Sequence, residues 1–280
     1  MTEKNSLDSE QARYWNEGGG RRWAANIERV ERMLQPLAAR LVEHAAALPG
    51  ERVIDVGCGG GLTSKALAEA VGATGAVLGL DVSSIILEVA RARFANVANL
   101  RFVHGDAGSM ALEQGDYDLI TSRFGVMFFP DATGAFAHLH SALKRSGRLK
   151  FICWRALKLN PWMAIPVKAA FEILPRPEPL PPNAPGPFGL ADESYLREVL
   201  TRAGFRDIEI TPNEVMLDLG TLEDAVEQMT RMGPPAQAFD EATAAMQAEV
   251  LRALRAAFES FVTAGRVQLI SATWLVSARP

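Results

Sequence analysis

Hydrophobic positions recur every three or four residues near the start of the chain, and this spacing predicts an amphipathic helix over residues 21–48. Pro36 lies inside that pattern and should kink or divide the helix. Short β-branched runs then alternate with helical segments. The predicted strands are "RVIDV", "AVLGLDV", "LRFVHGD", "YDLITSRF" and "RLKFICW". The predicted helices between them are "LTSKALAEAV", "SSIILEVARARF" and "DATGAFAHLHSALKRSG", of which the last ends at Gly147.

This alternation predicts an α/β fold with a doubly wound parallel sheet, covered by helices on both faces. In such a sheet, ligands bind beyond the carboxyl ends of the strands. The residues expected near a ligand are therefore those that follow the strands: 57–61, Asp81, Asp106, 123–128 and the stretch from Trp154 onward.

Beyond Trp154 the pattern changes. A proline-rich segment over residues 174–190 should be extended and cover the core, and "DESYLREVLTRAGF" predicts a helix with Asp192 near its start. "RDIEITP" and "QLISATWLVSA" predict two further strands, and the largely helical residues between them, 219–264, are interpreted as an insertion. We therefore divide the chain into an N-terminal helical segment, residues 1–48, and a core, residues 49–280.

Composition excludes several classes of protein. The formal net charge of the 280 residues is -4, whereas nucleic-acid-binding domains carry a basic excess. The polar, acidic start is unlike a secretory leader, and no apolar run approaches the roughly 18 residues of a membrane span. Cys58 and Cys153 suggest neither a disulfide framework nor a zinc site. We expect a soluble cytoplasmic protein that binds no nucleic acid and no metal and inserts into no membrane.

The segment "VIDVGCGGGL" ends a predicted strand with a glycine-rich turn, and two kinds of cofactor site begin in this way. A dinucleotide-binding turn has the pattern G-x-G-x-x-G, but counting from Gly57 places Leu62 at the third glycine position. The pattern Asp55-x-Gly57-x-Gly59-x-Gly61 fits in full. An acid at position 55 would repel a pyrophosphate, whereas it would favour a cationic ligand or one that carries an amino group.

Four motifs at successive strand ends resemble those of class I S-adenosylmethionine-dependent methyltransferases of the bacterial small-molecule type. The motifs are "VIDVGCGGG", "VLGLDVS", "VHGDAGSM" and "YDLITSRFGVMFFPD". The N-terminal "YWN" and "GRRW" are similar to one group of these enzymes, and similar sequences carry out C-methylation in ubiquinone and menaquinone biosynthesis. The resemblance implies a Rossmann-like, mainly parallel seven-stranded sheet with an antiparallel last strand and helices on both faces.

The resemblance also implies that S-adenosyl-L-methionine is the cofactor and that residues 1–48 form a helical lid over it. Asp81 resembles the acid that binds both ribose hydroxyls, and Asp106 resembles the acid that binds the adenine amino group. Asp55 and the glycine loop would hold the methionine part, and Tyr14 is the N-terminal aromatic residue expected to touch the ligand. The predicted cofactor-binding residues are Tyr14, Trp23, Asp55, Gly57, Cys58, Gly59, Gly61, Asp81, Val82, Asp106, Ala107 and Arg123.

Methyl transfer from a sulfonium needs chiefly alignment and the exclusion of water, and a general base only where the acceptor is protonated. None of the four histidines stands out as a base, so no catalytic residue is assigned. Aromatic residues and a methionine after the fourth and fifth strands suit a flat or apolar small-molecule acceptor. The predicted acceptor-binding residues are Phe124, Met127, Phe128, Trp154, Trp162 and Phe188.

Several alternatives stay open at this point. The methylated atom of the acceptor could be oxygen, nitrogen or carbon, and the chain could be a monomer or a homodimer. An NAD(P)-dependent oxidoreductase would use the same kind of sheet, although Leu62 and Asp55 argue against it. A catalytically inactive, methyltransferase-like binding protein would keep the same cofactor residues.

Overall fold

A computed structural model of the chain describes residues 9–280. The strands are β1 (Arg52–Val56), β2 (Ala76–Asp81), β3 (Leu100–His104), β4 (Tyr117–Arg123), β5 (Leu143–Trp154), β6 (Arg206–Asp218), β7 (Val262–Thr263) and β8 (Arg266–Arg279). The α-helices are α1 (Glu10–Asn16), α2 (Gly18–Ala25), α3 (Ile27–Ala45), α4 (Leu62–Val71), α5 (Ser84–Arg93), α6 (Ala132–Ala142), α7 (Pro161–Ala170), α8 (Glu193–Arg202), α9 (Leu222–Met232), α10 (Ala236–Glu241) and α11 (Ala244–Glu259). Short 3-10 helices are η2 (Gly125–Phe128) and η3 (Leu157–Leu159).

The main sheet has the strand order β3-β2-β1-β4-β5-β8-β6. Its first five strands pair in parallel, whereas β8 pairs antiparallel with both β5 and β6. The predicted mainly parallel seven-stranded sheet with an antiparallel last strand is therefore confirmed. The chain leaves β1 toward β2 on one side and returns to β4 on the other, so the strand order reverses between β1 and β4. A ligand site is expected beyond the carboxyl ends of these two strands.

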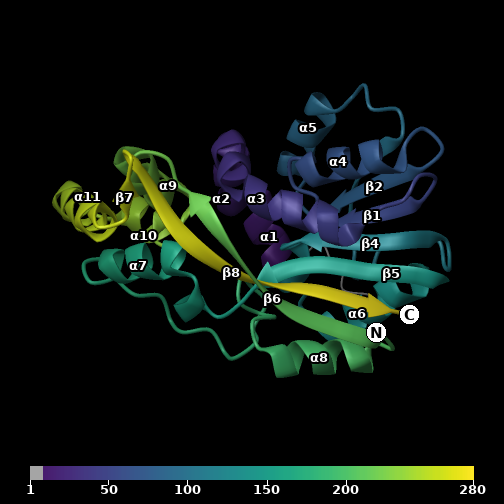
Figure 1. Cartoon of the computed structure of the whole chain (residues 1–280). Coiled ribbons are helices and arrows are strands. Elements are labelled where there is room, and N and C mark those ends of the chain that lie inside the picture. Colours follow the sequence, from purple (N-terminus) through teal and green to yellow (C-terminus); the bar gives the residue numbers. More distant parts are fainter. Residues whose placement is uncertain (1–8) are drawn as a thin grey trace.

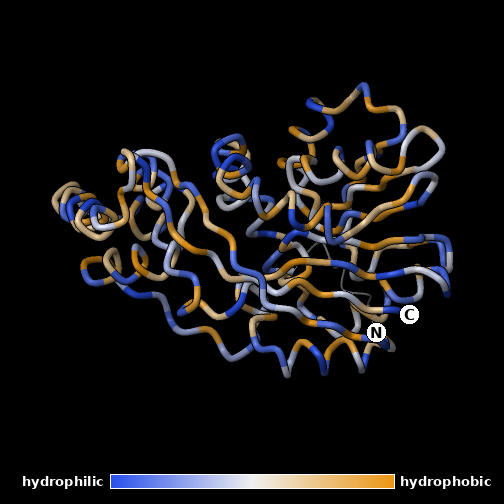
Figure 2. The backbone as a smooth tube through the Cα atoms, viewed as in Figure 1, coloured by the Kyte–Doolittle hydropathy of each residue, from blue (hydrophilic) through white to orange (hydrophobic). Residues whose placement is uncertain are grey.

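Helices cover both faces of the sheet (Figure 1), as the alternating pattern predicted. The helices α3, α4 and α5 pack on one face, and α6 and α8 pack on the other. The core between them contains fully buried side chains such as Leu37 of α3, Phe136 of α6 and Phe151 of β5. Hydrophobic segments follow the central strands, and hydrophilic segments gather at the outer turns (Figure 2).

Side chains cap the helices where the sequence places short polar residues. The Ser83 hydroxyl accepts a hydrogen bond from the Ile86 N–H at the start of α5, and the Asp192 carboxylate accepts one from the Tyr195 N–H at the start of α8. These bonds satisfy backbone donors that a helix leaves unpaired in its first turn. Both helix starts are confirmed as predicted.

One predicted helix end is wrong, and one predicted helix break lies at another residue. The helix expected to end at Gly147 ends at Ala142, because Leu143 already pairs with Tyr117 of β4 and begins β5. Lys144 forms an ion pair with Asp118 at 2.8 Å, which holds this early part of β5 against its neighbour. Pro36 does not divide the N-terminal helix, since α3 runs through it, and a kink at Pro36 stays a prediction. The break lies instead at Asn26, whose side-chain amide donates to the Arg22 carbonyl at 2.8 Å.

The antiparallel strands β6 and β8 extend beyond the sheet into a second group of helices (Figure 1). Between these strands in sequence lie α9, α10, α11 and β7, and α11 packs on α7 and α9 around the fully buried Phe258. This group is joined to α3 by an ion pair between Arg29 and Glu227 at 2.6 Å. Within residues 9–280, no helix combines the length and the apolar character needed to cross a membrane.

Candidate cofactor and acceptor site

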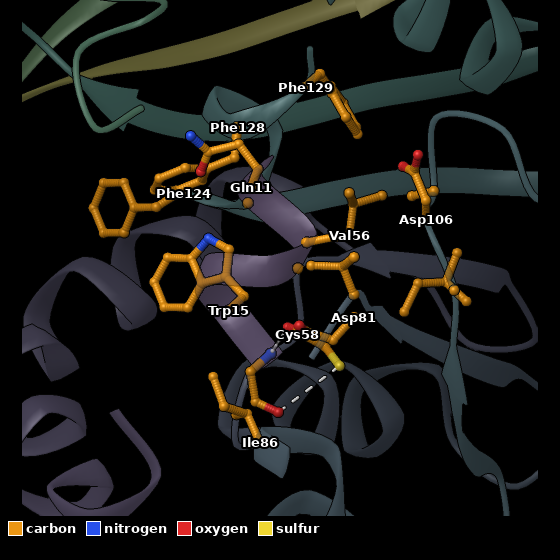
Figure 3. A pocket seen from close by; sticks show the side chains of 18 of the residues that line it. Gln11, Trp15, Val56, Cys58, Asp81, Ile86, Asp106, Phe124, Phe128 and Phe129 are labelled. Atoms are coloured by element: carbon orange, nitrogen blue, oxygen red, sulfur yellow. Dashed lines mark hydrogen bonds between the residues drawn. The ribbon is translucent and has the colours of Figure 1, made fainter. Parts of the chain in front are cut away.

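A cavity of about 140 Å³ opens beyond the carboxyl ends of β1, β2, β3 and β4 (Figure 3). The residues that line it all lie between Ser9 and Pro130. They come from the ends of the parallel strands, from the glycine loop and from the N-terminal helices. The cavity therefore lies where the reversal of strand order predicts a ligand site.

The glycine loop forms the floor of this cavity between β1 and α4. Gly57 and Gly59 line the cavity and adopt φ angles of 66° and 54°, a left-handed conformation that glycine adopts without strain. A Cβ atom at Gly57 would come within 2.5 Å of the Gly125 Cα, so the loop and η2 approach each other as bare backbone. Cys58 also lines the cavity, and burial raises the pKa of its thiol well above the usual value. Gly61 lies outside the lining and precedes the first residue of α4.

Asp81 ends β2 and ties the glycine loop to the start of α5. Its Oδ2 accepts a hydrogen bond from the Gly59 N–H at 2.8 Å, and its Oδ1 accepts one from the Ser83 N–H at 2.9 Å. Burial raises the pKa of Asp81, while the N–H groups of Ser83 and Gly59 oppose that rise. Each carboxylate oxygen has further lone-pair capacity. Asp81 can therefore accept hydrogen bonds from two vicinal hydroxyl groups of a ligand in the cavity.

Asp106 follows β3 at another edge of the cavity. Its Oδ1 accepts a hydrogen bond from the Gly108 N–H at 2.8 Å, which orients the carboxylate. Ala107 and Val82 line the cavity beside it, so a flat ring could lie on apolar surface within reach of this acceptor. Figure 3 shows Asp106 on the opposite side of the cavity from Trp15 and Phe124. Asp106 and these two aromatic rings thus face each other across the cavity.

Asp55 lies beneath the glycine loop and does not line the cavity. It is buried, and its Oδ2 accepts a hydrogen bond from the Ser64 hydroxyl at 2.6 Å. Burial raises the pKa of Asp55 to about 6, against the opposing effects of that hydrogen bond and of the Arg123 charge. Asp55 therefore connects the loop to α4 from within. A direct contact between Asp55 and a ligand stays a prediction.

The N-terminal helices place Trp15 and Trp23 in the cavity lining, whereas Tyr14 lies outside it with 49% of its surface exposed. Hydrogen bonds hold this segment to residues 82–84, which follow β2, and the Ser84 N–H and hydroxyl both donate to Asn16 Oδ1. The Ser83 hydroxyl donates to the Trp15 carbonyl at 2.6 Å, and the Asn16 amide donates to the Val82 carbonyl at 2.8 Å. Of the neighbouring aromatic pair, it is therefore Trp15 that faces the cavity. The part of the predicted lid before Ser9 lies outside the described residues.

Aromatic rings from β4 and η2 continue the lining beside Trp15. Phe124 and Phe128 both line the cavity, and the Phe128 ring packs edge-on against Trp15 with centroids 5.3 Å apart. Phe124 has a φ of 72°, which is uncommon for a residue with a bulky side chain. Its ring stacks on that of Trp154, with the two centroids 4.1 Å apart.

The remaining predicted acceptor residues lie behind this lining. Met127, Trp154 and Trp162 are buried in the core, where the Trp154 N–H approaches the Met127 Sδ at 3.5 Å. Phe188 is partly buried against the same core. Trp154 supports the lining from behind, because its ring stacks on that of Phe124. Their contact with an acceptor stays a prediction.

Several lining residues had not been singled out from the sequence, namely Ser9, Gln11, Ala12, Trp15, Glu31, Val56, Leu80, Ile86, Gly105, Phe129 and Pro130. Phe129 and Pro130 directly follow Phe128 in the motif, so the signal for them was present. Glu31 lies four residues after Ile27 on the buried face of α3, and only its helical position indicated that it faces inward.

The histidines of the chain bind backbone carbonyl groups or pack against the core. The rings of His44, His104 and His138 lie within 2.9 Å of the carbonyl oxygens of Val276, Val82 and Met110, respectively. His140 packs edge-on against Phe205. Within residues 9–280, no cluster of three or more His, Cys, Asp or Glu side chains is arranged to hold a metal ion.

Comparison with known proteins places a domain on this part of the chain. Residues 53–147 match the family described as "Methyltransferase domain". The demethylmenaquinone methyltransferase of Staphylococcus epidermidis is 39% identical over 98 residues, which cover 35% of this chain and 41% of the relative. The aklanonic acid methyltransferase DauC of Streptomyces sp. (strain C5) is 36% identical over 118 residues, which cover 41% of this chain and 54% of the relative. The chain thus spans about half the length of these relatives or less.

Solved structures share the fold across nearly the whole chain. The phosphoethanolamine N-methyltransferase 2 of Haemonchus contortus, in complex with S-adenosyl-L-methionine, has a TM-score of 0.61 at 14% identity, covering 97% of this chain and 60% of that one. The geranyl diphosphate C-methyltransferase of Streptomyces coelicolor A3(2) has a TM-score of 0.51 at 14% identity, and the match covers 98% of this chain and 87% of that one. The [4+2]-cyclase SpnF has a TM-score of 0.53 at 18% identity, and the match covers 88% of this chain and 81% of that one. At these identities the likeness shows the fold alone.

The matched segment contains the glycine loop and two of the acids that line the cavity, Asp81 and Asp106, whereas the lining residue Glu31 precedes it. The resemblance to class I methyltransferases that was drawn from the four motifs is confirmed by these matches.

Proposed function

We propose that this chain, whose residues 53–147 form a methyltransferase domain of the class I type, transfers a methyl group from S-adenosyl-L-methionine to a small, apolar or aromatic acceptor. The observation that carries the proposal is the arrangement around Asp81. This carboxylate closes the glycine loop through the Gly59 N–H and lies in the same cavity as Asp106. A nucleoside with free ribose hydroxyls and an exocyclic amino group matches these two acceptors.

The residues of the cavity fit the parts of S-adenosyl-L-methionine. Asp81 would accept hydrogen bonds from the two ribose hydroxyls. Asp106 would accept a hydrogen bond from the adenine amino group, next to the Ala107 backbone. Gly57 and Gly59 leave the room that a close approach to backbone requires. The loop carries Leu62 as the first residue of α4, where a dinucleotide-binding turn needs a glycine, and this argues against NAD(P).

When bound, the sulfonium supplies a methyl group that is already activated for displacement. The residues of the chain then need to align the acceptor and exclude water, and such alignment contributes on the order of 7–11 kcal/mol in well-oriented systems. Trp15, Phe124 and Phe128 provide an aromatic surface beside the proposed cofactor position. These rings hold an acceptor in place by packing, and they keep water away from the reacting atoms.

The acceptor is proposed as a small organic molecule. The aromatic rings in the cavity lining favour an apolar or aromatic acceptor, and the two relatives described above are named for demethylmenaquinone and aklanonic acid. The acceptor itself sets the methylated atom, because its own nucleophile determines whether oxygen, nitrogen or carbon is methylated. We propose further that the protein acts in the cytoplasm as a monomer or homodimer.

We propose that residues 1–48 act as a lid and that residues 219–264 support it. The described part of the lid contributes Trp15 and Trp23 to the cavity lining. On its outer side, Arg29 pairs with Glu227 and the Gln228 amide lies 2.7 Å from the Met33 sulfur. The helices of the insertion thus pack on the same helix that borders the cavity.

Ligand binding tests the proposed cofactor. We expect S-adenosylhomocysteine to raise the melting temperature and NAD to leave it unchanged. A ligand at about 100 times its Kd adds roughly 2.7 kcal/mol to the free energy of unfolding, which is readily measured. Stabilisation by NAD alone would overturn the proposal in favour of an oxidoreductase.

Turnover tests the proposed activity. Phenols, quinone-like compounds, amines and carboxylic acids would be screened with S-adenosyl-L-methionine for release of S-adenosylhomocysteine. Incubation of the protein with a radiolabelled methyl donor and a cell extract extends the screen to acceptors outside the panel. Binding of the cofactor with no labelled product in either assay would favour the methyltransferase-like binding protein.

A further inference from the structure

Asn160 is a fully buried amide that lies behind the cavity lining, between η3 and α7. Its side chain exchanges two hydrogen bonds with the backbone of Ala272 in β8. The Ala272 N–H donates to Oδ1 at 2.8 Å, and Nδ2 donates to the Ala272 carbonyl at 3.1 Å. Nδ2 also donates to the carbonyl of Arg155, just after β5, at 3.0 Å. Because a side-chain amide offers both a donor and an acceptor, Asn160 pairs with β8 as a strand residue would.

Trp162 extends this network toward the cavity. Its indole N–H, the single donor of that side chain, donates to Asn160 Oδ1 at 3.2 Å. Its ring packs against Trp154 with centroids 5.2 Å apart and an interplanar angle of 46°. Trp154 in turn stacks on Phe124, with centroids 4.1 Å apart and an angle of 10°. Three rings in contact therefore lead from Asn160 to Phe124, which lines the cavity.

These rings have little room to turn. Trp154 and Trp162 are 5% and 7% exposed, so both are enclosed by the core. Phe124 has a φ of 72°, and a bulky residue keeps such a backbone conformation where the surrounding structure imposes it. The nearly parallel stack on Trp154 sets the plane of the Phe124 ring, and the hydrogen bond to Asn160 fixes the far end of the stack.

We propose that Asn160 is a positioning residue of the acceptor site, which sets the plane of the Phe124 ring through Trp162 and Trp154. This inference rests on the proposed function, and it adds a residue that determines the preference for a flat aromatic acceptor. Asp106 lies on the opposite side of the cavity from Phe124 (Figure 3), so cofactor affinity should not depend on Asn160.

The preference for an aromatic ring is measured with two probes of similar size. With S-adenosylhomocysteine saturating, calorimetry gives the affinities of 2-naphthol and of its saturated counterpart, 2-decalol. We expect the wild-type protein to bind 2-naphthol about threefold to tenfold more tightly, which is the contribution of one aromatic contact. Phe124→Leu should remove most of this preference. Asn160→Ala should lower it by a similar factor and leave the affinity for S-adenosylhomocysteine unchanged.

A double-mutant cycle separates positioning from a general loss of structure. Trp162→Phe keeps a ring against Trp154 and removes the N–H that Asn160 accepts. If Asn160 acts through Trp162, the double variant should lower the preference no further than the stronger single variant, whereas independent effects would multiply. Near-ultraviolet circular dichroism, which reports the packing of the two indoles, should change in Asn160→Ala.

Asn213→Ala is the matched control, because Asn213 of β6 is also a buried amide bonded to β8. Its Nδ2 donates to the Thr273 hydroxyl at 2.9 Å, and its Oδ1 accepts from Arg40 Nε at 3.3 Å. These partners belong to no aromatic stack. Asn213→Ala should therefore lower the melting temperature, as Asn160→Ala does, while the preference for 2-naphthol stays as in the wild-type protein.

The outcomes distinguish this inference from the proposed function. Wild-type protein that does not bind S-adenosylhomocysteine overturns the proposed function. A wild-type complex without a preference for 2-naphthol, or with one that Phe124→Leu leaves unchanged, overturns the aromatic acceptor surface and this inference with it.

Other outcomes overturn the role of Asn160 alone. These are a preference that is lost in Phe124→Leu and kept in Asn160→Ala, effects that multiply in the double variant, and an equal loss of preference in Asn213→Ala. If Asn160→Ala fails to fold, Trp162→Phe tests the inference by itself. An unchanged preference in that variant would overturn it.

Discussion

The two halves of the sheet differ in what they contribute to the cavity. The parallel strands β1, β2, β3 and β4 are 5 to 7 residues long, and the cavity lies at their carboxyl ends. The antiparallel strands β6 and β8 are 13 and 14 residues long and carry none of the lining residues. Parallel strands joined by crossover helices bring successive strand ends to one edge, which long antiparallel strands do not. The first half therefore forms the site, and the second supports it.

The largest expected effect tests whether the supporting half acts on stability alone. Phe258→Ala removes a fully buried ring of α11, and the cavity it leaves should lower the free energy of unfolding by about 3–5 kcal/mol. Urea denaturation measures this loss, and calorimetry at low temperature measures S-adenosylhomocysteine binding to the folded molecules. Affinity should be unchanged. A folded variant that no longer binds would show that the two halves are coupled.

The next effect concerns the site itself. Asp81→Ala removes the proposed ribose contact together with the acceptor for the Gly59 and Ser83 N–H groups. Affinity for S-adenosylhomocysteine should fall about a hundredfold or more, equivalent to roughly 3 kcal/mol, while circular dichroism shows the fold retained. Asp218→Ala is the matched control in the other half, because Asp218 ends β6 and caps the Gly220 N–H. Equal affinities in the two variants would mean that the ribose contact lies elsewhere.

A third prediction uses pH to examine the buried acid below the glycine loop. Burial raises the pKa of Asp55 from 3.8 to about 6, so the protonated form favours the folded state. Its stabilising contribution is present below pH 3.8 and is lost as the pH rises through about 6. Relative to Asp55→Asn, the wild-type protein should lose roughly 3 kcal/mol between pH 4 and pH 7. Parallel stability profiles for the two proteins would contradict this assignment.

The smallest expected effect concerns the end of α3, the helix that contacts both halves of the sheet. Ala46 is exposed there and has a φ of 46°, a left-handed conformation that favours glycine. Ala46→Gly should raise the free energy of unfolding by about 1 kcal/mol. Gly72→Ala is the matched opposite, because Gly72 ends α4 with a φ of 67°, and it should lower stability. Thermal denaturation measures the stability of both variants. If both substitutions changed the free energy of unfolding in the same direction, the left-handed backbone at these two positions would not be its cause.

The sequence was most informative about the half that forms the site. The loop from Gly57 to Gly61, Asp81 and Asp106 each follow a strand that the alternating pattern predicts. Once a parallel sheet is inferred, its strand ends must meet. Even the two helix starts at Ser83 and Asp192 could be predicted, because capping depends on residues three positions apart.

Other features depended on contacts between distant residues. Tyr14 and Trp15 are equivalent in the sequence, and packing of α1 on the β2 end decides that Trp15 lines the cavity. The helix before β5 ends early because Leu143 pairs with Tyr117, a partner 26 residues away in sequence.

The sequence by itself determined the succession of strands and helices along the chain, the glycine loop and the acids at the strand ends. These follow from local backbone preferences and from hydrophobic periodicity, which neighbouring residues set. Only the tertiary structure decided which aromatic rings face the cavity, that Arg123 lies in the same lining, and that Asn160 binds the Trp162 ring behind it. A side chain's surroundings come from elements far away in the chain, and no local pattern encodes them.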